Sequence, residues 1–261
     1  MLLNEPGRTD YDWTFHLFGF EVRTHPAFLI TPILLGRGFL SQFQDSVNTG
    51  VGWLVLITVF WVSVLIHELG HALAFRYYGI HSRIVLYWLG GLAIPDSANV
   101  WRPRRSNSLR PGQQVIVSLA GPVAGLLLSG VLCVLVYTLG GRIALLDFLI
   151  PVPGPVLEGS TIPPASVLGL IFWTGIILNF VMNLFNLVPI FPLDGGQVAR
   201  QLMIQADPTD GLRNSIFLSL AACIGMILLS LKMENSFGAI FFGLMAFSNY
   251  QSLQGYGGSR W

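Results

Sequence analysis

Long uncharged apolar runs constrain the fold of this chain more than any other feature of its sequence. No charged residue occurs in the stretches 46–66, 111–141 and 159–193. Because a membrane-spanning helix needs about 20 consecutive apolar residues, each of these runs is long enough to cross a bilayer. Charged residues make up 10% of the chain, whereas a soluble domain carries about 25%. The sequence therefore predicts an α-helical polytopic membrane protein.

Hydropathy along the chain places about six transmembrane helices in one membrane-embedded domain that covers residues 1–261. The expected spans lie near 27–40, 51–77, 113–139, 166–188, 214–231 and 236–250. The first and last of these are short, and 27–40 also contains Arg37, so its full crossing is left open. No remaining stretch is long enough for a separate soluble domain. Within the third span, Gly121 and Gly125 have the GxxxG spacing that is typical of close helix packing.

The positively charged residues predict the orientation of these helices. With a cytoplasmic N-terminus, 11 arginines fall on the cytoplasmic side, and Arg37, Arg142 and Lys232 fall on the other side. This asymmetry follows the positive-inside rule. The first residues lack the basic start and apolar core of a signal peptide, so we expect the first membrane segment to direct insertion. The chain is thus expected to be a multi-pass integral membrane protein, in the cell membrane if its source is prokaryotic.

Two stretches have the composition of β-strands and are too short to span a membrane. In 83–101, a β-branched and aromatic segment is followed by a glycine pair at 90–91, and a similar segment at 15–26 ends in Pro26. Backbone groups at membrane depth must form their hydrogen bonds within the protein. We therefore expect these two stretches to pair in a small membrane-associated β-sheet at the cytoplasmic interface.

The segment His67-Glu68-Leu69-Gly70-His71 carries the clearest chemical signal. On a helix, positions i and i+4 share a face, so both imidazoles can bind one zinc ion. Glu68 lies beside them, where it can activate a water molecule for hydrolysis. Ionisable side chains at membrane depth are costly. A metal site therefore explains this segment better than structural coincidence does.

A catalytic zinc ion takes three protein ligands and leaves one position for water. Asp194 is the candidate third ligand, because it ends a long uncharged stretch and precedes a glycine pair, where the backbone can turn tightly. An aspartate before glycine is more often a turn or a helix cap, but the two histidines require a further ligand. The sequence thus predicts one Zn²⁺ ion held by His67, His71 and Asp194, with Glu68 as the catalytic base.

Two motifs resemble those of the site-2 protease family of intramembrane zinc metalloproteases. That family joins a helix with HExxH to a later NxxPxPxxDG segment, and this chain has HELGH at 67–71 and NLVPIFPLDGG at 186–196. Four positions of the second motif match residue by residue: Asn186, Pro189, Asp194 and Gly195. The departure is Phe191, where the pattern usually has its second proline. The ligand spacing is unaffected by this departure.

The resemblance implies regulated intramembrane proteolysis, in which a peptide bond is cut in or near a transmembrane segment of a membrane protein substrate. It implies a minimal member without the extra soluble domains of some relatives. It also implies a catalytic role for Asn186, whose amide would hold the substrate carbonyl or stabilise its oxyanion. Asn179 and Asn183 lie on the same helix face, and hydrogen bonding between helices is the simpler explanation for both.

Two alternatives share part of this pattern. A membrane zinc protease that acts on soluble or misfolded chains at the cytoplasmic face would keep HELGH, but the pairing with Asp194 disfavours it. A non-catalytic zinc-binding membrane bundle would need a fourth protein ligand, and it would have no use for Glu68. The net charge of +1 gives no indication of a nucleic-acid partner. The oligomeric state is left open.

Overall fold

The computed structural model describes residues 5–40, 47–88, 90–95, 109–139 and 166–258. Their contacts group into two compact units. The N-terminal unit consists of Pro6–Trp101 and Val123–Asn183. The C-terminal unit consists of Met1–Glu5, Arg102–Pro122 and Leu184–Trp261. The expectation of a single domain therefore stays a prediction.

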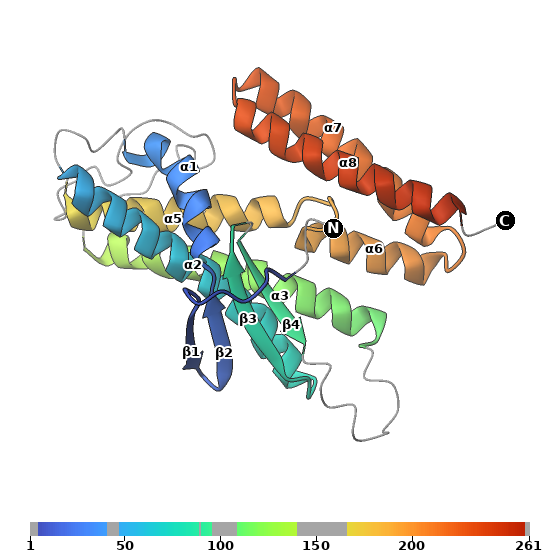
Figure 1. The fold of residues 1–261 in the computed structure, drawn as a ribbon, viewed down its shortest axis with the longest axis horizontal. Coiled ribbons are helices and arrows are strands. Elements are labelled where there is room, and N and C mark those ends of the chain that lie inside the picture. The colour runs from blue at the N-terminus through green and yellow to red at the C-terminus, as the bar shows by residue number, and fades with distance from the viewer. Residues whose placement is uncertain (1–4, 41–46, 89, 96–108, 140–165, 259–261) are drawn as a thin grey trace. The chain divides into compact units, whose positions relative to one another are not determined.

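The described residues form seven α-helices, one short 3-10 helix and one four-stranded sheet (Figure 1). In chain order the elements are β1 Trp13–Leu17, β2 Phe20–Thr24, η1 Pro26–Leu29, α1 Ile30–Leu40, α2 Thr49–Tyr77, β3 Ser82–Tyr87, β4 Gly90–Pro95, α3 Pro111–Thr138, α5 Val167–Asn186, α6 Asp194–Ala206, α7 Gly211–Lys232 and α8 Ser236–Gly258.

Four of the described helices are long and apolar enough to cross a membrane: α2, α3, α5 and α7. They confirm the spans expected at 51–77, 113–139, 166–188 and 214–231. The segment expected at 27–40 forms η1 and α1 in the described residues and is not among these four. At 1.5 Å per residue, the 11 residues of α1 rise about 16 Å, roughly half the thickness of the hydrocarbon core.

The last expected span, 236–250, forms a helix but is not among the four membrane-spanning candidates. It lies in α8, whose first half is apolar and aromatic. Polar residues such as Asn249 and Gln251 follow in its second half. The apolar part of α8 is therefore shorter than a full crossing of the bilayer requires.

The sheet has the strand order β1-β2-β3-β4 and is built from two antiparallel hairpins. The first hairpin turns through Phe18 and Gly19, which both have positive φ, as a two-residue type I′ turn requires. The hairpins join because β2 and β3 pair in parallel, with Val22 opposite Ile84. This confirms the predicted pairing of 15–26 with 83–101. The first stretch is a hairpin and not a single strand, and residues 96–101 lie outside the described part of the chain.

The sheet packs against the second half of α2. Val22 and Ile84 are fully buried and belong to the same hydrophobic cluster as Leu69 and Ala72 of α2. Both β3 and β4 contact this helix. The small side chain of Ala72 lets the sheet approach the helix closely. The sheet therefore covers the part of α2 that carries the HELGH segment.

Helices α2 and α5 run in the same direction where they touch. Asn179 of α5 contacts Ser63 of α2, and one turn further along both helices Asn183 contacts His67. Two spans with the same direction need one crossing of opposite direction between them. The predicted order of spans supplies that crossing through α3.

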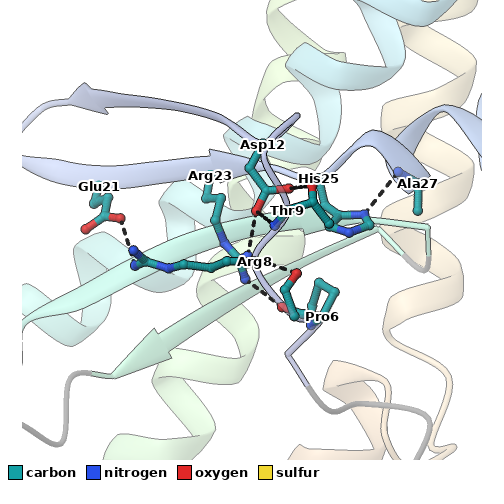
Figure 2. A network of polar contacts seen from close by, with 9 residues as sticks. Pro6, Arg8, Thr9, Asp12, Glu21, Arg23, His25 and Ala27 are labelled. Carbon is teal, nitrogen blue, oxygen red and sulfur yellow. Dashed lines mark hydrogen bonds and ion pairs between the residues drawn. The ribbon is translucent and has the colours of Figure 1, made fainter.

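Arg23 of β2 is a buried charge that ties the segment before β1 to the sheet (Figure 2). It donates to Asp12 Oδ2 at 2.8 Å and to the carbonyl oxygens of Pro6 and Gly7 at 3.0 and 3.5 Å. Thr9 donates to both carboxylate oxygens of Asp12. Burial raises the pKa of the Asp12 carboxyl, but hydrogen bonds from Thr9 and Arg23 outweigh burial and hold that pKa below its usual value.

We expect Asp12→Asn to lower the midpoint of thermal unfolding at neutral pH, because it removes the carboxylate charge that pairs with the buried Arg23 at 2.8 Å. A hydrogen bond to a charged group contributes about 1.5–3 kcal/mol. Folding lowers the pKa of Asp12. The ionised carboxylate therefore adds to the free energy of unfolding at pH values above the unfolded-state pKa, and this stabilisation is lost as the pH falls through the folded-state pKa. The difference in unfolding midpoint between Asp12→Asn and wild type should therefore become smaller at acidic pH.

Glu21→Gln is the matched control, because Glu21 forms an exposed ion pair with Arg8 at 3.6 Å. Exposed pairs contribute about 0–1 kcal/mol. Equal unfolding midpoints for the two variants at neutral pH would contradict a stabilising role for the buried pair.

Candidate metal centre

His67 and His71 lie one turn apart on α2, and both side chains are buried. Their Nε2 atoms are 3.1 Å apart. Two zinc–nitrogen bonds of about 2.0–2.1 Å that meet at a tetrahedral angle hold their nitrogens about 3.3 Å apart. The two imidazoles are therefore arranged as a pair of ligands that bind one ion through Nε2.

The other ring nitrogen of His67 faces an asparagine. Nδ1 of His67 lies 2.7 Å from Oδ1 of Asn183, and both residues are buried. An amide oxygen only accepts hydrogen bonds, so Nδ1 carries the proton and donates. The lone pair of His67 is then on Nε2, the atom that faces His71. Sequence analysis explained Asn183 by hydrogen bonding between helices, which is confirmed, but it missed that the partner is a predicted metal ligand.

Glu68 follows His67 on α2 and is also buried. It packs against β4, because a Cβ atom on Gly91 would overlap with the Glu68 side chain. The sequence predicted a turn at the glycine pair 90–91. In the structure Gly91 has a second role, since the absence of a side chain leaves room for the carboxylate of Glu68.

Tyr87 is a buried polar residue near this carboxylate. It pairs with Gly90, the neighbour of Gly91 in β4, and 2% of its surface is exposed. Its hydroxyl has no hydrogen-bond partner among the described residues. Burial raises the pKa of the Tyr87 phenol to about 12, and the negative charge of Glu68 acts in the same direction. The phenol is therefore neutral at physiological pH.

Asp194 is the first residue of α6 in the C-terminal unit, and 8% of its surface is exposed. A Cβ atom on Gly195 would overlap with the carbonyl of Leu187, and one on Gly196 would overlap with the backbone at Ile190. The loop between α5 and α6 thus folds closely over the start of α6. This agrees with the tight backbone approach predicted for the glycine pair.

Phe191 marks the departure from the family pattern, and its backbone is bonded on both sides within the C-terminal unit. Its N–H donates to Ser219 Oγ of α7 at 3.0 Å. Its carbonyl accepts from Asn249 Nδ2 of α8 at 2.6 Å. A proline at position 191 has no N–H and could not make the first of these bonds. Phenylalanine therefore adds a link between the loop and α7 that the usual proline cannot provide.

The predicted site residues thus fall in two groups. His67, Glu68 and His71 lie together on α2 in the N-terminal unit. Asp194 begins α6, and Asn186 is the last residue of α5 and half-buried, both in the C-terminal unit.

Comparison with known proteins assigns the chain to a family. The model of peptidase family M50 matches residues 55–229. The Synechocystis protein sll0528 is 33% identical over 198 residues, which are 72% of this chain and 43% of that protein. Zinc metalloprotease MJ0392 of Methanocaldococcus jannaschii is 27% identical over 192 residues, which are 72% of this chain and 44% of that protein. The chain therefore spans less than half the length of these two relatives.

The name of the Synechocystis protein proposes a zinc metalloprotease, and that of the archaeal protein states one. Among solved structures, the site-2 protease from Methanocaldococcus jannaschii has a similar fold, with a TM-score of 0.54 and 23% identity. The match covers 93% of this chain and 95% of that one. Since the family model covers well over half of the residues, including the HELGH and DGG segments, this chain belongs to peptidase family M50, the site-2 protease family.

Proposed function

We propose that this chain is a zinc endopeptidase that hydrolyses a peptide bond in or near a transmembrane segment of a membrane protein. The observation that carries the proposal is the buried imidazole pair on α2, with its Nε2 atoms 3.1 Å apart and a buried glutamate next to it in sequence. A purely structural zinc site has no use for that glutamate. In a member of family M50, the same arrangement supports hydrolysis.

The proposed zinc ligands are His67, His71 and Asp194. Each of these three side chains is buried, and each is of a type that binds metal ions. Two imidazoles and one carboxylate are a known ligand set of catalytic zinc, and they leave one position for water. When bound, zinc lowers the pKa of water to about 7 and polarises a carbonyl group.

Glu68 is the proposed general base and acid. Its carboxylate would accept a proton from the attacking water and later pass this proton to the leaving amine. The contact with Gly91 supports this role, because it restricts where the Glu68 side chain can lie. Asn186 would orient the substrate carbonyl, a role that rests on its match to the family motif.

Family membership and the four apolar helices make the chain an integral membrane protein that is embedded in a lipid bilayer. β2 before 27–40 pairs with β3 after α2, so both lie on one side of the membrane and 27–40 counts as a crossing together with α2. We propose that the N-terminus is cytoplasmic, because with 27–40 and 236–250 counted as spans this orientation puts 11 of the 14 positively charged residues on the cytoplasmic side. Alkaline phosphatase, which is active outside the cytoplasm, should be inactive when fused to the N-terminus. High activity of that fusion would reverse the proposed orientation.

Strand β4 is the proposed docking site for the unwound substrate. A helical segment must open before its carbonyl can be attacked, since its own hydrogen bonds shield the backbone. β4 stands at the edge of the described sheet and packs on Glu68 through Gly91. A substrate strand that paired with β4 would regain backbone hydrogen bonds next to the catalytic base.

We expect Glu68→Gln to retain zinc and to lose cleavage by at least about 100-fold, because a general base contributes about 10²–10⁴-fold. The measurement combines metal analysis of the purified protein with cleavage of a tagged transmembrane substrate. His67→Ala is the control, since removal of a ligand should lower both zinc content and cleavage. Asp194→Ala should behave in the same way. Equal cleavage by wild type and Glu68→Gln would end the proposed role of this residue.

The docking site is tested with proline in β4. Adjacent N–H groups of a strand point to opposite edges, so Leu92→Pro and Ala93→Pro each remove one donor, from different edges. One of these N–H groups points away from β3, toward the free edge where the substrate strand would pair. The variant that loses this N–H should show lower cleavage, with unchanged zinc content and thermal stability. Leu92→Val and Ala93→Val keep both donors and serve as controls. Unchanged cleavage in both proline variants would rule out docking at β4.

The position of the cut distinguishes the proposal from its nearest alternative. Mass spectrometry of the products should place the cut in or next to the transmembrane segment of the substrate. Cuts confined to soluble loops would favour the alternative, a protease of soluble or misfolded chains at the cytoplasmic face.

A further inference from the structure

Two asparagines of α5 make equivalent contacts to α2. Asn183 lies 2.7 Å from His67 Nδ1, and Asn179 donates to Ser63 Oγ at 2.8 Å. Both asparagines are buried, with 0% and 1% of their surfaces exposed. The two contacts are one helical turn apart, but only the contact of Asn183 reaches a proposed zinc ligand. A comparison of the two asparagines can therefore distinguish a role in helix packing from a role at the metal site.

The orientation of the Asn183 amide follows from its second contact. One amide atom lies 2.5 Å from the carbonyl oxygen of Asn179, which can only accept a hydrogen bond. That atom is therefore Nδ2, and the atom that faces His67 is Oδ1. An amide oxygen requires a proton on Nδ1 of His67. The backbone carbonyl of Asn179 thus sets the orientation of the Asn183 amide, and this orientation places the proton of His67 on Nδ1.

Helix α3 leaves space for this amide. A Cβ atom on Gly125 would overlap with the amide group of Asn183. The sequence predicted that the GxxxG spacing at 121–125 serves close helix packing. In the structure, the missing side chain at position 125 makes room for a polar group that holds a proposed metal ligand.

We infer that Asn183 is a positioning residue of the zinc site, because it fixes the tautomer and the ring orientation of His67 through the Nδ1–H···Oδ1 bond. This inference rests on the proposed function, in which His67 binds zinc through Nε2. Partners that hold the second nitrogen of a histidine ligand commonly strengthen metal binding by 10–100-fold. Asn183 itself touches neither substrate nor metal in this role.

We expect Asn183→Leu to weaken zinc binding by about 10–100-fold, because it removes the acceptor for His67. The affinity is measured on the full chain in detergent by competition with a chromophoric zinc chelator. Asn183→Asp keeps an oxygen acceptor for His67 Nδ1 but loses the amide donor to the Asn179 carbonyl, so it should bind zinc more tightly than Asn183→Leu does. In the cobalt-substituted protein, the visible absorption spectrum should change more for Asn183→Leu than for Asn183→Asp.

Asn179→Leu is the matched control. It removes a buried hydrogen bond between the same two helices but leaves Oδ1 of Asn183 in place, so it should lower thermal stability without a loss of zinc affinity. If both leucine variants lose zinc affinity equally, or if Asn183→Leu binds zinc as wild type does, the positioning role is wrong. A wild-type chain that binds no zinc would instead overturn the proposed function. These failures are distinguishable without any measurement of cleavage.

Discussion

The buried polar face of α2 is the constraint on which the N-terminal unit depends. His67, Glu68 and His71 lie where burial of an unpaired polar group is costly. The surrounding elements contact these side chains from different sides. Helix α5 supplies the Asn183 acceptor to His67, and β4 presents a glycine to Glu68. Helix α5 therefore determines which nitrogen of His67 is left for the metal, and the sheet restricts where the Glu68 side chain can lie.

Small residues make this arrangement possible. Gly91 on β4 and Gly125 on α3 each stand where a Cβ atom would overlap with a functional side chain. Ala72 on α2 is fully buried under the sheet. Close approach of backbones is usually discussed as a source of van der Waals packing between membrane helices. Here the space left by the small residues is filled by a carboxylate and an amide.

In the C-terminal unit, hydrogen bonds and close packing hold the loop between α5 and α6 in place. The backbone of Phe191 is bonded to α7 through Ser219 and to α8 through Asn249. The two glycines after Asp194 let α6 begin directly beneath this loop. The carboxylate of Asp194 is thus held at the start of a helix whose entry is fixed by two other helices. The replacement of proline by phenylalanine at position 191 fits this scheme, because it adds a backbone donor.

The sequence by itself determined the four apolar spans, the strand-forming stretches and the HELGH and DGG segments, because hydropathy, alternation and helical spacing are properties of neighbouring residues. Four of the about six expected spans are long and apolar enough for a full crossing, whereas α1 is short and α8 turns polar halfway along its length. Only the tertiary structure decided which partners the buried groups have. Asn183 and His67 are 116 positions apart in the chain, and Gly91 meets Glu68 only because the sheet folds onto α2. Such contacts depend on how distant elements pack, and no local pattern of residues encodes them.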